Sequence, residues 1–128
     1  MITFIELIFF LLVHWVADFC YQTDEQAKNK SKSNYYLLSH TVTYSAIWFI
    51  FIALYLMTIK SEEPVMFFKI GLFTVITFLS HTVQDYFTSR LNTKLWNKGD
   101  THNFFVSVGF DQVLHYIQLI GTYLLLFK

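Results

Sequence analysis

The chain has 128 residues, of which 55% are hydrophobic, 20% aromatic and only 14% charged. A soluble chain carries roughly 25% charged residues, so this composition is typical of a protein that exposes apolar surface to lipid. The formal net charge is zero and Cys20 is the single cysteine, so no basic field for nucleic acid, no internal disulfide and no cysteine-pair zinc site is expected.

Four apolar stretches follow one another along the chain, and each is near the ~20 residues that a helix needs to cross a bilayer. They cover residues 2–21, 35–59, 65–87 and 104–127. Since backbone polar groups must be paired inside lipid, we expect each stretch to be a helix. The sequence therefore predicts an all-α fold: a single transmembrane domain over residues 1–128, built as an integral membrane four-helix bundle with the lipid bilayer as its partner.

Two further features concern the first stretch and the connection between the second and the third. The first stretch has Glu6 where a signal peptide would be basic, and it lacks a small-residue cleavage site, so we interpret it as a retained membrane helix. A tight turn is predicted at residues 60–64, where Pro64 suits the start of the third helix.

The basic residues predict how the bundle is oriented. Connections 22–34 and 88–103 share one side and together hold six Lys or Arg residues, whereas the other side has Lys60, Lys69 and Lys128. The positive-inside rule then places both long connections in the cytoplasm and both termini outside the inner membrane.

Imidazole and carboxylate groups recur four residues apart in three of the four stretches. Four residues is about one helical turn, so each pair shares a face. The order of the pair is reversed in the fourth helix, which runs opposite to the first and third, so every pair puts its Asp near the cytoplasmic surface and its His one turn deeper. One more His begins the second helix at comparable depth. The candidate site residues are His14, Asp18, His40, His81, Asp85, Asp111 and His115.

This set of side chains indicates a metal site. A carboxylate at the centre of a membrane costs roughly 2.5–3.5 kcal/mol on insertion scales, so three of them need cationic partners. Imidazole with carboxylate suits divalent zinc, manganese or iron, which the donors alone do not distinguish. Seven candidates exceed one tetrahedral site and are enough for two ions. Paired ions commonly activate water for hydrolysis, which makes a metal-dependent hydrolase of a phosphoester or lipid the leading hypothesis.

The same residues also suit other functions. A metal-ion or proton transporter would need ionisable groups continuing to the far face, where the sequence offers only Glu6, although a homo-oligomer could complete a path. The pairs could also be interhelical bonds in a structural or pore-forming module. Four inward histidines could ligate haem, but haem leaves the repeated Asp partners unexplained.

Taken together, the motifs resemble those of domain-of-unknown-function family 3307, small bacterial and phage integral membrane proteins. The resemblance spans nearly the whole chain and implies a membrane location without an established activity. A more distant likeness, to small inner-membrane proteins named for metal-dependent hydrolysis, implies no substrate. The motifs are His14-x-x-x-Asp18-Phe19, Gln22-Thr23-Asp24, Leu38-x-His40, His81-x-x-x-Asp85-Tyr86 and Asp111-Gln112-x-x-His115.

Overall fold

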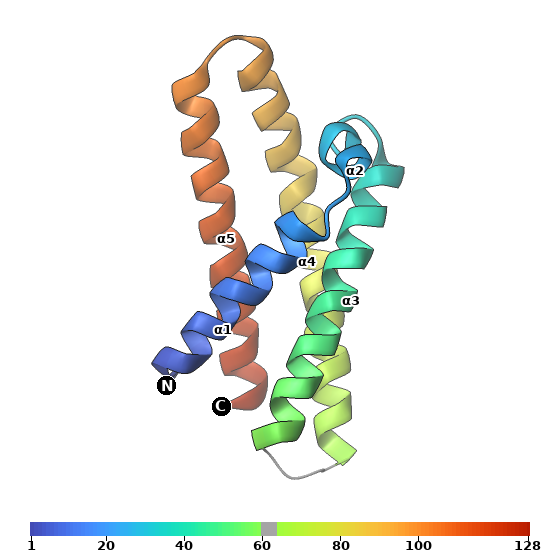
Figure 1. Cartoon of the computed structure of the whole chain (residues 1–128), viewed down its shortest axis with the longest axis vertical. Helices are drawn as coiled ribbons and strands as arrows, with labels where there is room; N and C mark the ends of the chain where they lie inside the picture. Colours follow the sequence, from blue (N-terminus) through green and yellow to red (C-terminus); the bar gives the residue numbers. More distant parts are fainter. Residues whose placement is uncertain (60–63) are drawn as a thin grey trace.

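Helices make up nearly all of the structure, a computed structural model that describes residues 1–59 and 64–128. Helix α4 packs against both α3 and α5, while α1 crosses the bundle at a slant and contacts α3 and α5 (Figure 1). The predicted all-α fold is thereby confirmed. The helices are α1 (Phe4–Trp15), the π-helix η1 (Val16–Cys20), α2 (Asp24–Asn29), α3 (Asn34–Ile59), α4 (Pro64–Asn97) and α5 (Thr101–Phe127).

Side-chain caps explain where the amino-terminal helices begin. The Thr3 hydroxyl accepts from the Glu6 amide at 3.2 Å, and the Glu6 carboxylate accepts from the Thr3 amide at 2.7 Å. Thr23 and Gln26 form the same reciprocal box at the start of α2. These bonds pair backbone donors that the first turn of a helix leaves without partners.

Helix α4, the third of the four predicted helices, is longer than the sequence predicted. It continues to Asn97 instead of ending at residue 87, so most of the expected connection 88–103 is helical and only residues 98–100 lie outside α4 and α5. The prediction followed the apolar pattern, which ends near residue 87, whereas the helix itself continues as a polar extension. Gly99 ends it with φ of 72°, a left-handed conformation that glycine adopts without a steric penalty.

The predicted first connection is also partly helical, because it contains α2. The first helix is shorter than predicted: regular α1 ends at Trp15 and the π-helix ends at Cys20, where residue 21 was expected. The tight turn predicted at residues 60–64 lies largely outside the described residues, but Pro64 does begin α4.

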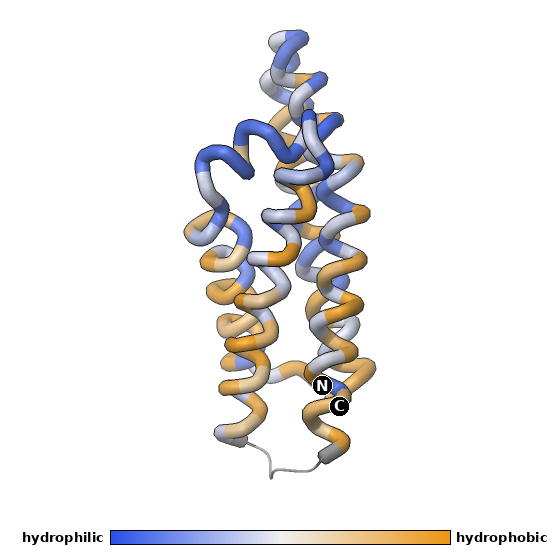
Figure 2. Tube along the Cα trace, turned by 90° about the vertical axis from the view of Figure 1, so that its right-hand side faces the viewer, coloured by the Kyte–Doolittle hydropathy of each residue, from blue (hydrophilic) through white to orange (hydrophobic). Residues whose placement is uncertain are grey.

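An aromatic layer fills the half of the bundle nearest the two termini. The rings of Phe10 and Trp48 stack with centroids 5.2 Å apart, and Tyr123 meets Phe10 edge-on at 5.1 Å. Phe73 and Leu119 complete this layer, and all five side chains are fully buried. Figure 2 shows hydrophobic residues dominating this half and hydrophilic ones gathering at the opposite end, which we name the polar end.

The outer surface of the bundle is unusually apolar. Large side chains such as Leu54, Phe67, Val83 and Ile117 are more than half exposed. Continuous surface of this kind marks contact with lipid or with another protein. Among the described residues, two helices are long and apolar enough to cross a membrane, Asn34–Thr58 and Val65–Asn97. The sequence predicted four such helices. Helix α1, with 12 residues, is only about 18 Å long, which is too short to cross a bilayer by itself.

Candidate metal centre

The π-helix places the first carboxylate of the centre. The amide of Tyr21 donates to the carbonyl of Val16, five residues back, at 3.0 Å. This wider turn begins after His14 and contains Asp18, so the two residues lie on different kinds of helix, and their nearest side-chain atoms are 3.8 Å apart. Single π turns occur frequently at functional sites, because they redirect one side chain out of the regular helical register.

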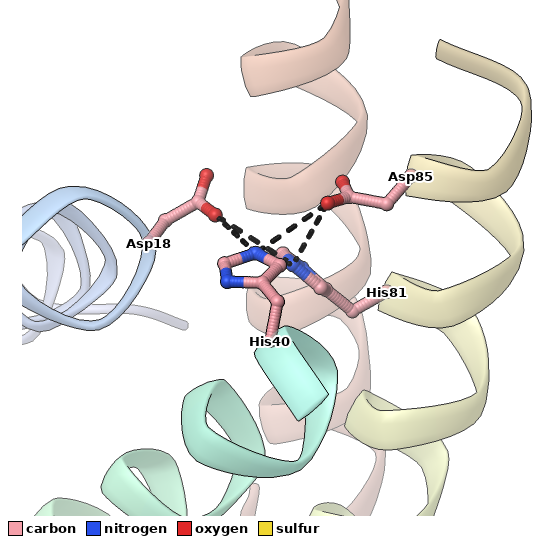
Figure 3. Close-up of side chains that lie close together, drawn as sticks. All are labelled: Asp18, His40, His81 and Asp85. Atoms are coloured by element: carbon pink, nitrogen blue, oxygen red, sulfur yellow. Dashed lines mark hydrogen bonds and ion pairs between the residues drawn. The ribbon is translucent and has the colours of Figure 1, made fainter. Parts of the chain in front are cut away.

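Four side chains from three different segments form the first group of donor atoms. Asp18 from η1, His40 from α3, and His81 with Asp85 from α4 are all buried, and Figure 3 shows them pointing toward one another. The Nε2 atom of His40 lies 3.0 Å from Asp18 Oδ1, 3.1 Å from His81 Nε2 and 3.4 Å from Asp85 Oδ2. The Nε2 atom of His81 lies 3.6 Å from each of the same carboxylate oxygens.

These spacings could also accommodate a metal ion. A single N–H group on His40 can point at only one of its three neighbours. Ligands about 2.1 Å from a tetrahedral ion are separated by roughly 3.4 Å, and the five spacings fall on both sides of that value.

A second group contains Asp85 again, with Asp111 and His115 from α5. The Nε2 atom of His115 lies 3.3 Å from Asp85 Oδ1 and 3.3 Å from Asp111 Oδ1. Asp85 therefore faces the first group with Oδ2 and the second with Oδ1. Each group keeps its candidate ligand atoms within 4.8 Å of one another.

Several buried atoms of the two groups have no hydrogen-bond partner within the described residues. They include Asp111 Oδ1, both ring nitrogens of His115, and the Nδ1 atoms of His40 and His81. Buried polar atoms are nearly always paired in folded proteins. In the part of the chain that the structure describes, atoms without partners also occur at Ser45, Trp48 and Gln118, so it is the convergence of nitrogen and oxygen atoms in these two groups that could hold a metal ion. The atoms left without bonds in the second group face each other across 3.3 Å, which fits a cation between them.

Lys30, which the sequence reasoning did not place in the site, reaches the centre from the connector between α2 and α3. Its Nζ atom lies 2.8 Å from Asp85 Oδ2. Burial lowers the pKa of Lys30, but the nearby carboxylates of Asp85 and Asp18 outweigh it, so the pKa is raised and the amine stays charged. Thr93 donates to Ser31 at 2.8 Å and thereby ties the connector to α4.

His14 lies beside the centre and belongs to neither group. Its Nδ1 atom is 2.8 Å from the Tyr44 hydroxyl, and its Nε2 atom is 2.8 Å from Gln112 Oε1. The amide nitrogen of Gln112 donates to Asp111 at 3.2 Å and reaches Asp18 at 3.5 Å. The pair His14–Gln112 therefore positions carboxylates, whereas the structure brings the other six predicted residues directly together.

Aromatic stacking holds two of the imidazoles in place. The His81 ring stacks on Tyr44, at a centroid distance of 3.8 Å, and on His115, at 4.3 Å. Both pairs are stacked, with interplanar angles of 16° and 28°. Tyr44 was not among the predicted residues, and one Tyr among eight gives no sequence signal for this role.

The fold and the site together define a class: an all-α protein with candidate membrane helices and two buried His/Asp groups that could each hold a metal ion. The chain belongs to the DUF3307 family of proteins of unknown function, whose model matches residues 6–128, so the resemblance read from the motifs is confirmed. No curated protein and no solved structure matches the chain.

Proposed function

We propose that this chain is an integral membrane protein whose polar end binds two divalent metal ions bridged by Asp85, and that it hydrolyses a phosphoester. The observation that carries the proposal is the division of Asp85 between the two groups, Oδ2 to one and Oδ1 to the other. Carboxylates that join helices in this way are common in paired-metal sites of helix bundles.

The two positions differ in the number of donors. The first has four, from Asp18, His40, His81 and Asp85, which completes a tetrahedral set. The second has three, from Asp85, Asp111 and His115, and so keeps a coordination position for water, as catalytic sites do. Bound metal ions would supply Lewis-acid activation of water there, and these carboxylates and imidazoles would hold the ions.

The residues between the centre and the two termini are of both kinds, apolar and polar. Phe10, Trp48, Phe73 and Leu119 form a fully buried apolar layer. Polar groups continue beside that layer, because Gln118 donates to the buried Thr77 at 3.4 Å and to Thr122 at 3.2 Å. Transport would need such groups along the whole path, so the preference for hydrolysis rests on the three-donor group and not on this layer.

Orientation in the membrane remains part of the proposal. Helix α2 and the connection between α4 and α5 lie at the end of the bundle opposite the two termini (Figure 1). The basic residues in and next to these segments are Lys28, Lys30, Lys32, Arg90, Lys94 and Lys98. The positive-inside rule supports a cytoplasmic polar end with both termini outside.

Elemental analysis of the protein purified in detergent tests the proposal. We expect about two zinc, manganese or iron ions per wild-type chain after reconstitution, about one in Asp111→Asn, and phosphoester hydrolysis only in the wild type. Folded wild-type protein without stoichiometric metal would rule out the metal centre. Two bound ions without hydrolysis of any phosphoester or lipid would rule out the enzyme and leave the metal site standing.

A further inference from the structure

A cleft of about 970 Å³ opens at the polar end, beside the metal centre. One wall comes from α2 and the connector that follows it, the other from the polar extension of α4 and the start of α5. The lining residues used below are Lys30, Lys32, Ser89, Asn92, Trp96 and Phe105.

The charge of the cleft is positive. Lys28, Lys30 and Lys32 line it, whereas Glu25 is the only acidic side chain among its lining residues. Glu25 already accepts a hydrogen bond from Asn29 at 3.0 Å. Two of the lysines have carboxylate partners outside the cleft lining: Lys28 lies 3.8 Å from Asp24 and Lys30 lies 2.8 Å from Asp85. Among the described residues, Lys32 alone of the three has no carboxylate partner, and it attracts an anion to the cleft. Each ammonium group has three N–H donors, so Lys28 and Lys30 can also donate to phosphate oxygens.

The floor of the cleft carries polar atoms that lack partners. Ser89 Oγ and Asn92 Oδ1 are buried, and within the described residues neither atom has a hydrogen-bond partner. Ser89 itself is only 9% exposed. Buried polar atoms of this kind are usually satisfied by a bound molecule or water, so they point to a ligand in the cleft. The Ser89 hydroxyl can donate to an anion, whereas Asn92 Oδ1 can only accept and therefore needs a hydroxyl group on the ligand.

The cleft and the metal centre share one face of α4. Ser89 follows Asp85 by one helical turn, which is about 6 Å along the axis, and Asn92 follows by about two turns. Lys30 lines the cleft and also contacts Asp85 at 2.8 Å. A ligand bound at Ser89 and Lys30 would therefore have its anionic group next to the metal-bridging carboxylate.

The outer rim of the cleft is aromatic. The Trp96 and Phe104 rings lie 5.0 Å apart, and Trp96 and Phe105 are 59% and 63% exposed. Aromatic side chains at a membrane–water boundary are suited to molecules with one polar and one apolar end.

We propose that this cleft is the substrate site of the metal centre and binds a phosphate group carried by a lipid or by a small soluble ester. The proposal rests on the proposed function. The lysines and the Ser89 hydroxyl donate to the phosphate oxygens, and Asn92 Oδ1 accepts from a hydroxyl group of the ligand, either on a protonated phosphate or on the rest of the ester. The aromatic rim holds the apolar part of a lipid.

The test compares binding of two probes to the full chain in detergent or nanodiscs: phosphatidic acid in phosphatidylcholine nanodiscs, and glycerol 3-phosphate in solution. Lys32→Gln and Asn92→Leu each remove one cleft contact without touching the centre. The matched control is Lys94→Gln, which makes the same charge change on an exposed α4 residue outside the cleft. Ser89→Ala is a second, less disruptive probe of the floor, and circular dichroism checks that each variant is helical.

We expect each cleft variant to weaken binding of at least one probe by about tenfold, the loss of one charge-assisted hydrogen bond, while Lys94→Gln changes it less than about twofold. The probe whose binding is sensitive identifies the source of the phosphate. Equal affinities in all four variants, for both probes, would overturn the inference. Metal content measured on the same samples separates the two claims: two ions per chain with insensitive binding overturns only the cleft, whereas wild type without metal overturns the centre.

Discussion

Two buried polar clusters lie at opposite ends of the same bundle, and they differ in how completely their atoms are paired. Near the termini, the Glu6 carboxylate accepts from the Tyr123 hydroxyl, from Lys128 Nζ at 2.9 Å and from the Thr3 amide at 2.7 Å. Every strong acceptor there has a donor. We name this set the Glu6 cluster.

At the polar end, the His/Asp centre has more buried donor and acceptor atoms than it has bonds. Asp111 Oδ1 and both ring nitrogens of His115 make no hydrogen bond within the described residues, although His115 Nε2 lies 3.3 Å from an oxygen of Asp85 and 3.3 Å from Asp111 Oδ1. Burial of charge is common to both clusters, so burial alone does not indicate a ligand. The convergence of several His nitrogen and Asp oxygen atoms within 4.8 Å of one another is what distinguishes a candidate metal site from a structural ion pair.

The largest effect is expected from Asp85→Asn, which removes the bridging carboxylate. An amide cannot offer two anionic oxygens, so metal content should fall from about two ions per chain to fewer than one, and hydrolysis by at least about 100-fold. Elemental analysis and a phosphoester assay measure the two quantities. Glu6→Gln is the matched control, since it neutralises a buried carboxylate in the Glu6 cluster. Equal metal loss in both variants would show that the two clusters do not differ as described.

Metal should stabilise the fold through the centre. Free zinc or manganese at 100 times its dissociation constant should add about 2.7 kcal/mol to the unfolding free energy, and a chelator should remove this gain. Thermal unfolding in detergent reports it as a rise in Tm that depends on metal concentration. The gain should shrink in Asp111→Asn and persist in Glu6→Gln; a Tm insensitive to metal in the wild type would count against binding.

Glu6→Gln should lower stability without changing metal content. The change weakens the contacts of Tyr123 and Lys128 with a buried carboxylate, which we expect to cost about 1–3 kcal/mol. Thermal unfolding gives the loss, and elemental analysis of the same sample gives the metal content. Unchanged stability would mean that this cluster does not hold α1 to α5.

The smallest effect is expected at His14, which lies beside the centre. His14→Gln should cost about 1 kcal/mol of stability, because the bond to Tyr44 or Gln112 weakens, and it should leave two ions bound. His115→Gln is the matched comparison, and it should lose one ion. If His14→Gln removes an ion instead, His14 is a ligand and the boundary drawn around the two groups is wrong.

Much of the centre could be predicted from spacing alone. Four residues make about one turn, so His81 with Asp85, and Asp111 with His115, had to share a face whichever way the helices packed. The alternating helix directions then placed these pairs and His40 at one level. The geometry that divides Asp85 between two groups depends on side-chain rotamers at a three-helix contact, which no single stretch of sequence encodes.

The departures from the sequence-based picture have local causes. Lys30 could not be placed, because its position depends on α2 and on the Thr93–Ser31 contact that ties the connector to α4. His14 was assigned to the site by its helical spacing from Asp18, but both of its ring nitrogens bond Tyr44 and Gln112, which no spacing reveals. The extension of α4 to Asn97 was missed because the prediction followed the apolar stretch, and the helix continues beyond it through polar residues.

The central claim is that Asp85 joins two metal ions, and electron paramagnetic resonance of the manganese-loaded protein tests it most directly. Two Mn²⁺ ions sharing a carboxylate lie about 3.5–4 Å apart and are exchange-coupled. We predict a coupled dimanganese spectrum for the wild type at two ions per chain, and the isolated six-line spectrum of a single ion for Asp111→Asn. A wild-type protein that binds two ions yet gives only the isolated six-line spectrum would contradict the account.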